Sequence, residues 1–186
     1  MIHSHPNSLS VREVQQSDFM SIVEYFQNAD KDLLLRMGVD PAKLPEGAKW
    51  LQLLSDDHER PIQEKKFYYI IWLLNNTPVG HSNVNKIIFG LEEYMHLHIW
   101  DVQTRQKGLG AEFIKLSLPY YFERLSLRRL YCEPSASNPA PNKTLARCGF
   151  QFVKQYDTTP GWINFYQTVN RWCLDVDSYT AMQGEK

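Results

Sequence analysis

The chain of 186 residues has few cysteines and almost no net charge, and each shortage excludes a class of protein. Cys132, Cys148 and Cys173 are widely spaced, with no CxxC pair and no Cys/His cluster at metal-ligand spacing. We therefore expect no metal site and buried thiols in a reducing cytoplasm. A formal net charge of −1 excludes a global basic field, so neither nucleic acid nor an anionic membrane is an expected partner.

The chain also lacks long apolar runs. No stretch reaches the roughly 18 apolar residues of a membrane span, and MIHSHPNSLS lacks the charged-then-apolar pattern of a signal peptide. These features predict a soluble, cytoplasmic protein. With 43% hydrophobic residues the chain can bury a core. Its length predicts one domain over residues 1–186, with an N-terminal extension at 1–8 and a C-terminal tail at 172–186.

Hydrophobic patterning predicts strands that alternate with short helices. Strands are expected at residues 9–14, 67–74, 78–85, 94–100, 128–133, 150–156 and 163–169. Helices are expected after Asp18, in two pieces within 29–55, from 109 to a proline-limited end near Pro119, and from Pro139 to a stop at Gly149. The last two strands should pair antiparallel, and the tail beyond Trp172 is only weakly patterned.

A glycine turn, RQKGLGAEF at residues 105–113, separates the expected strand 94–100 from the following helix. Such a junction frees backbone N–H groups and points them, with the positive end of the helix dipole, at an anion. Phosphate is the obvious candidate. The turn lacks both the GxxxxGK[ST] spacing of a P-loop and the full GxGxxG of a dinucleotide fold, so a nucleotide-binding fold agrees poorly with it.

The element order around this turn resembles the GNAT superfamily of N-acetyltransferases. The resemblance is clearest from Tyr94 to Phe150, where RQKGLG fits the pattern Q/R-x-x-G-x-G/A and Asn138 precedes the pair Gly149-Phe150 by eleven residues. The chain looks most similar to the ribosomal-protein N-terminal acetyltransferases and the small-molecule enzymes grouped with them. This implies an α/β (α+β) fold: a mixed, mostly antiparallel twisted sheet of about seven strands, flanking helices, and splayed fourth and fifth strands.

The resemblance implies that the anion is the pyrophosphate of acetyl-CoA, the acetyl donor. The implied cofactor-binding residues of the turn are Arg105, Gln106, Lys107, Gly108, Leu109, Gly110 and Ala111. Their amides would hold the pyrophosphate, with Arg105 and Lys107 adding charge. Ile99 and Trp100 would lie along the thioester, where a backbone N–H stabilises the oxyanion. Asn138 would bond the pantetheine and also cap its helix.

Acetyl transfer to an amine needs a base, because an alkyl ammonium with a pKa near 10.4 is mostly protonated at neutral pH. Glu133 is the first candidate, since it lies five residues before Asn138, the offset of the glutamate assigned as base in ribosomal-protein acetyltransferases. His96 and His98, on one face of the expected fourth strand, are the rival pair. Aralkylamine acetyltransferases carry a comparable His-x-His, against which only His96 matches in position.

The position of the acid that usually protonates the leaving thiolate does not match the family pattern. Many members place a tyrosine seven residues after the asparagine, and here that position is Leu145. Tyr166 or Ser135 could serve instead, or solvent could. Cys132 is a conceivable nucleophile, although no helix end or cation is placed by the sequence to lower its pKa.

The sequence therefore predicts an acetyl-CoA-dependent N-acetyltransferase that acts by direct attack of a primary amine in a ternary complex. The acceptor stays open between a small-molecule amine and a protein N-terminus, and a non-catalytic acyl-CoA-binding sensor is the alternative. The aromatic residues Trp50 and Trp162 could line an acceptor pocket or belong to the core. Asp56 and Asp57 could attract a cationic acceptor or be solvated. An exposed edge strand near the C-terminus could form a homodimer.

Overall fold

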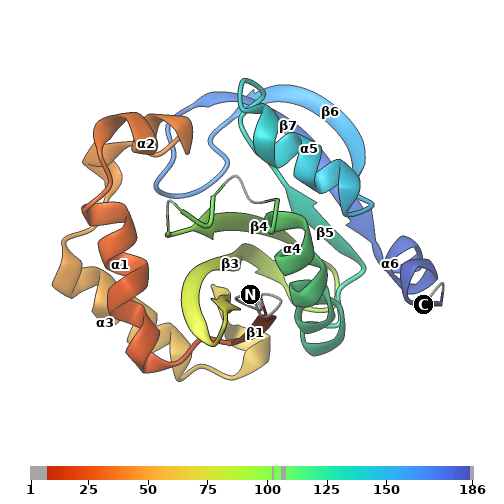
Figure 1. Cartoon of the computed structure of the whole chain (residues 1–186), viewed down its shortest axis with the longest axis horizontal. Helices are drawn as coiled ribbons and strands as arrows, with labels where there is room; N and C mark the ends of the chain where they lie inside the picture. Colours follow the sequence, from red (N-terminus) through yellow and green to blue (C-terminus); the bar gives the residue numbers. More distant parts are fainter. Residues whose placement is uncertain (1–7, 102, 106–107, 185–186) are drawn as a thin grey trace, which may run out of the picture.

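The computed structural model describes residues 8–101, 103–105 and 108–184, and its elements surround one open sheet (Figure 1). The strands are β1 (Leu9–Glu13), β2 (Tyr68–Leu74), β3 (Thr77–Ile88), β4 (Glu92–Ile99), β5 (Arg129–Cys132), β6 (Gln151–Thr158) and β7 (Gln167–Asp175). The α-helices are α1 (Phe19–Gln27), α2 (Lys31–Arg36), α3 (Gly47–His58), α4 (Gly110–Pro119), α5 (Pro139–Arg147) and α6 (Val176–Gly184). No helix of the described residues is both long and apolar enough to cross a membrane.

The sheet has the strand order β1-β2-β3-β4-β5-β7-β6, in agreement with the predicted seven-stranded, mostly antiparallel architecture. Only β4 and β5 pair in parallel, and the other neighbours are antiparallel. A parallel pair requires a crossover connection, and α4 provides it. Pro119 ends α4 as expected, but the chain then continues as a π-helical turn over Tyr120–Arg124.

The sheet carries a hydrophobic core on each face, which explains why β2 is almost entirely buried. On one face Trp72 stacks on Phe113 of α4, with ring centroids 5.0 Å apart. On the other face Ile71 packs in a core with Ile22 of α1. A strand covered on both faces must be apolar at every position, as the sequence of β2 is.

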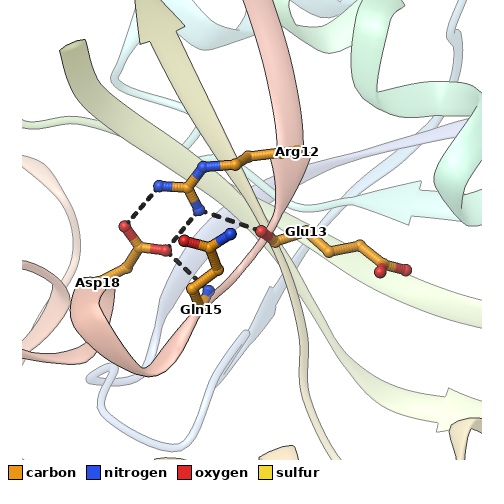
Figure 2. Close-up of polar contacts among 4 residues, drawn as sticks. All are labelled: Arg12, Glu13, Gln15 and Asp18. Atoms are coloured by element: carbon orange, nitrogen blue, oxygen red, sulfur yellow. Dashed lines mark hydrogen bonds and ion pairs between the residues drawn. The ribbon is translucent and has the colours of Figure 1, made fainter. Parts of the chain in front are cut away.

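The turn from β1 into α1 is fixed by an ion pair (Figure 2). Both carboxylate oxygens of Asp18 accept hydrogen bonds from the Arg12 guanidinium, at 2.6 and 2.9 Å. The expected cap of α1 is different in detail, because the Asp18 side chain accepts the Gln15 N–H at 2.8 Å and no N–H of α1. Burial raises the pKa of Asp18, but the hydrogen bond from Arg12 lowers it, and the net effect is a lowered pKa. Asp18 therefore stays ionised and holds β1 against α1.

Two C-terminal elements differ from the sequence-based prediction. β7 begins at Gln167 and not at residue 163, because the preceding segment bonds to the loop that follows α2. The Ile163 carbonyl accepts the Asp40 N–H at 2.8 Å, and the Phe165 N–H donates to the Gly38 carbonyl at 3.1 Å. These bonds replace a longer pairing with β6.

The weakly patterned tail beyond Trp172 contains the end of β7 and the whole of α6. Tyr179 anchors this helix by stacking on Phe122, with ring centroids 4.4 Å apart. Tyr179 is the buried residue of α6. The helix therefore lacks the wide apolar stripe from which a sequence pattern is recognised.

Glu93 is a buried acid on the face of β4 that also carries Met95. Neither of its carboxylate oxygens has a hydrogen-bond partner among the described residues. Burial raises the pKa of Glu93 well above its usual value. The neutral acid is therefore the favoured form in the folded protein.

Glu93→Gln should stabilise the protein more at pH 8 than at pH 5. A carboxyl whose folded pKa is raised destabilises the fold increasingly above its unfolded pKa of about 4.3, by up to about 1.4 kcal/mol per pH unit. Glutamine does not titrate. Urea unfolding of both proteins at both pH values measures the difference, with exposed Glu24→Gln as control. An unchanged or smaller advantage at pH 8 would contradict a raised pKa of Glu93.

Candidate functional site

β4 and β5 separate after a short parallel pairing, which confirms the predicted splay. Their pairing runs from Glu92 opposite Arg129 to Met95 opposite Cys132, whereas β4 continues to Ile99. Beyond Cys132 the chain follows β7 instead, since the Pro134 carbonyl accepts the Asn170 N–H at 3.0 Å. Proline has no N–H to donate to a ladder. Residues 96–99 therefore have no strand partner on the β5 side among the described residues, and this edge can pair with an extended ligand.

A cleft of about 120 Å³ lies at the splay. Its lining includes Met95, His96, Leu97, His98, Cys132, Glu133, Pro134, Ser135, Asn138 and Pro141, and also Arg36, Met37, Pro160, Asn164 and Gln167. A larger cavity of about 350 Å³, lined by α3 and by β1 and β2 residues, contains none of the predicted catalytic or cofactor-binding residues. We take the smaller cleft as the site, because it brings together side chains from β4, β5 and α5.

Asp57, one of the acids considered for attracting a cationic acceptor, lies on the larger cavity and away from the cleft. Its carboxylate accepts the N–H groups of Lys66 and Phe67 at 2.9 and 3.0 Å. This acid therefore holds the segment that leads into β2, and its role is structural.

The glycine turn leaves open space in front of α4. Gly108 has a φ of +74°, a left-handed conformation that suits glycine, and a Cβ at this position would meet no atom of the described residues within 4 Å. A Cβ on Gly110, the first residue of α4, would meet only Thr144 of α5 among the described atoms, at 3.7 Å. The first N–H groups of a helix have no partner within it. This geometry fits a phosphate group, whereas Gln106 and Lys107 lie outside the described residues.

Two residues that follow β4, Trp100 and Arg105, make different contacts from those predicted. Arg105 turns back and donates from Nε to the Ile99 carbonyl at 2.8 Å, so it holds the turn to β4. The Trp100 N–H donates to the Val79 carbonyl at 2.8 Å, and it is therefore not free to stabilise an oxyanion. The Trp100 indole N–H donates to His81 Nδ1, also at 2.8 Å.

Glu133 lies in the cleft with one carboxylate oxygen occupied. Its Oε1 accepts hydrogen bonds from Arg171 Nε, at 2.7 Å, and from the Tyr156 hydroxyl, whereas no described residue donates to Oε2. Burial and the Glu133 hydrogen bond raise the pKa of Tyr156 to about 12. The Arg171 guanidinium lies 5.4, 5.2 and 5.0 Å from the ring centroids of Tyr94, Tyr131 and Tyr156. The cation is therefore held on three aromatic rings beside the carboxylate.

Sequence reasoning missed Arg171 and Tyr156, which come from β7 and β6 and lie far along the chain from Glu133. A signal did exist, because Arg171 lies two residues after Val169, and in a strand this spacing places both side chains on the same face. An arginine on the same face of a strand as a buried valine needs a partner. The pattern does not say which carboxylate provides it.

His96 and His98 share the face of β4 that is turned toward α1. His98 packs against Phe26 and His81, with ring centroids 4.9 Å away in each case. Burial, followed by the charge of Lys86, lowers the pKa of His96 to about 4, and burial lowers that of His98 well below its usual value. Both rings are therefore neutral at pH 7, and His96 and His98 both line the cleft with Glu133.

The candidate acids and Cys132 differ in their position relative to the cleft and in their exposure. Tyr166 is 71% exposed and does not line the cleft, so the prediction of an acid role for it does not agree with the structure. Ser135 does line the cleft, with its Oγ 3.0 Å from Ser137 Oγ. Cys132 is buried and its pKa is raised by burial to about 12, which excludes a ready thiolate nucleophile. Asn138 caps α5 as predicted, accepting the Ala140 N–H at 3.3 Å, and also lines the cleft.

Comparisons with known proteins agree with this geometry. A family model described as an acetyltransferase (GNAT) domain matches residues 8–151. Spermidine N-acetyltransferase from Vibrio cholerae, solved with CoA and spermine, is 17% identical with a TM-score of 0.75, covering 92% of this chain and 98% of that chain. An aminoglycoside acetyltransferase solved with coenzyme A is 14% identical with a TM-score of 0.70, covering 95% and 99%. The search of curated proteins found no match.

Gly110→Trp should weaken the binding of acetyl-CoA by more than about tenfold, because the indole would fill the space at the start of α4 and block close approach to its amides. Isothermal titration with acetyl-CoA and with coenzyme A measures the loss. Gly184→Trp is the matched control, since a Cβ there also meets nothing within 4 Å and Gly184 ends the distant α6. Equal affinities in the two variants would show that the turn does not bind the cofactor.

Proposed function

Because the chain belongs to the GNAT family of acetyltransferases and is an acetyl-CoA-dependent N-acetyltransferase, we propose that it transfers the acetyl group directly to a primary amine in a ternary complex. The observation that carries this proposal is the Glu133 carboxylate at the splay of β4 and β5, with one oxygen fixed by Arg171 and Tyr156. The acceptor is a small-molecule amine or a protein N-terminus. The cytoplasmic location and the homodimer stay predictions.

The donor side of the cleft would hold acetyl-CoA through backbone groups. The N–H groups at the start of α4, the open edge of β4 and the amide of Asn138 are the groups that can bond it. When bound, acetyl-CoA supplies an acyl carbon activated by a thiolate leaving group. The chain's own residues then need only position the amine, remove its proton and exclude water.

Glu133 is the proposed general base. A primary ammonium with a pKa near 10.4 must lose a proton before it can attack, and Oε2 of Glu133 can accept this proton directly or through water. Arg171 and Tyr156 are positioning residues, because they bond Oε1 and so fix the plane of the carboxylate. The alternative base is His96, whose neutral ring lines the same cleft and whose Nε2 has no partner among the described residues.

No residue is required as a dedicated acid. Leu145 occupies the position where many GNAT enzymes have a tyrosine, and it is fully buried in the core beneath α4. Ser135 contributes a hydroxyl to the lining of the cleft, and this hydroxyl or solvent can protonate a thiolate. The names of the two similar structures, a spermidine and an aminoglycoside acetyltransferase, support an amine as acceptor.

Glu133→Gln should lower kcat by about 10²- to 10⁴-fold, because an amide cannot accept the amine proton. The affinity for acetyl-CoA should change little. Release of free coenzyme A with a panel of amines measures the rate, and exposed Glu64→Gln is the control. A rate within twofold of wild type would exclude Glu133 as base and leave His96. Binding of acetyl-CoA by the wild type without turnover of any amine would favour a sensor instead.

Tyr156→Phe should lower kcat about tenfold through loss of carboxylate orientation, with the affinity for acetyl-CoA unchanged. If Tyr156 acts only through Glu133, its removal should have little further effect in the Glu133→Gln background. Steady-state rates of the two single variants and the double variant test this. Additive losses would mean that Tyr156 contributes independently of Glu133.

A further inference from the structure

A recess of about 60 Å³ lies beside the cleft, between the sheet and the first helices. Its floor comprises two directly opposed pairs of β3 and β4, His81 with His98 and Asn83 with His96, followed by Asn85. Recess and cleft share Met37, His96, His98 and Asn164. The recess and the cleft therefore adjoin each other at these four residues.

The floor of the recess contains buried polar atoms without partners. His81 Nδ1 accepts the indole N–H of Trp100, so in the neutral ring the proton is on Nε2. This N–H has no acceptor, and Asn85 Oδ1 has no donor, among the described residues. Both side chains are more than nine-tenths buried. Buried polar groups left unpaired are costly and rare, so a donor and an acceptor in one recess indicate a site for a hydrogen-bonding ligand.

The recess provides no charge to pair with a charged ligand. Its lining has no Asp, Glu, Lys or Arg among the described residues. Its histidines are neutral at pH 7, because burial lowers the pKa of His81 to about 3 and that of His96 to about 4. A carboxylate or a second ammonium placed here would be buried without a counter-ion, which is strongly unfavourable.

The walls of the recess are aromatic and limit its size. Trp50 lies with its ring centroid 5.2 Å from that of Phe26 and 5.7 Å from that of Trp162. These rings exclude water and suit a flat group. The volume admits only a few heavy atoms, given that a single water needs at least about 10–15 Å³.

We propose that the recess is a specificity subsite for an uncharged amide next to the acceptor amine. An amide supplies an N–H that donates to Asn85 Oδ1. His81 lies four residues away along β3, roughly 13 Å between Cα atoms, so its Nε2–H bonds a separate acceptor of the ligand. The inference rests on the proposed function, because it requires that the amine is acetylated in the adjoining cleft. Such a subsite selects against polyamines and free amino acids as acceptors.

The test compares four amines of similar size under saturating acetyl-CoA. Glycinamide carries the amide, isobutylamine an apolar group of the same shape, ethylenediamine a second ammonium and glycine a carboxylate. With rates expressed per concentration of neutral amine, kcat/KM for glycinamide should exceed each of the others by about tenfold or more. Glycylglycinamide added to the series distinguishes a peptide amide from a terminal carboxamide.

Asn85→Leu removes the acceptor without changing the side-chain shape much. It should reduce the preference for glycinamide over isobutylamine by about tenfold, because glycinamide loses its hydrogen bond and slows more than isobutylamine does. The control is Asn28→Leu, at an exposed asparagine after α1. A loss of both activities in equal proportion would assign Asn85 a structural role and overturn the proposed contact.

The outcomes separate this inference from the proposed function. Acetylation of all four amines at similar rates, or a preference for isobutylamine, ethylenediamine or glycine, would leave the N-acetyltransferase proposal intact and overturn the amide subsite. The wild-type series decides this even if Asn85→Leu does not fold. No acetylation of any amine, peptide or polyamine would overturn both.

Discussion

The point where β4 loses β5 as its partner is the constraint on which the site depends. A continuous parallel pairing would close the sheet, and there would be neither a free edge of β4 nor a cleft. Pro134 and the bonds of the following segment to β7 carry the chain away from β4 just after Cys132. Because the chain leaves β4 at this point, Glu133 lies in the cleft. One local change in strand pairing therefore leaves the edge of β4 free and places an acid beside it.

The acceptor side is divided electrostatically. At the splay, Glu133 and Arg171 form an ion pair of 2.7 Å that is mostly excluded from solvent, and the hydroxyl of Tyr156 completes it. Next to it, His81, His96 and Asn85 present neutral polar groups within aromatic walls. Charge is thus confined to one end of the site, whereas the other end offers only neutral hydrogen-bonding groups. A low local dielectric strengthens both kinds of contact, provided that they are satisfied.

The fold was largely predictable, because its cues are local: the apolar run of β2, the cap at Asn138 and the glycines around α4 each act within a few residues. Placement across the sheet was not. Arg171 and Tyr156 meet Glu133 only through the order in which β5, β7 and β6 pair, and a single sequence does not encode that order in its spacing. The same limit explains Tyr166, which patterning assigned to a strand near the site and tertiary bonding leaves in solvent. α6 was missed because Tyr179 is its only buried residue among those described.

The position of β7 between β5 and β6 has a consequence for how the protein is made. The ribosome synthesises β5 first, then β6, and finally β7, which pairs with both. Until β7 emerges from the ribosome, one edge of β5 is unpaired and Glu133 lacks its ion pair with Arg171. The sheet is therefore complete only late in translation, through contacts between distant parts of the chain, which form slowly. A chain that ended before β7 would lack Arg171, so Glu133 would have neither its ion pair nor the neighbouring strand that positions it.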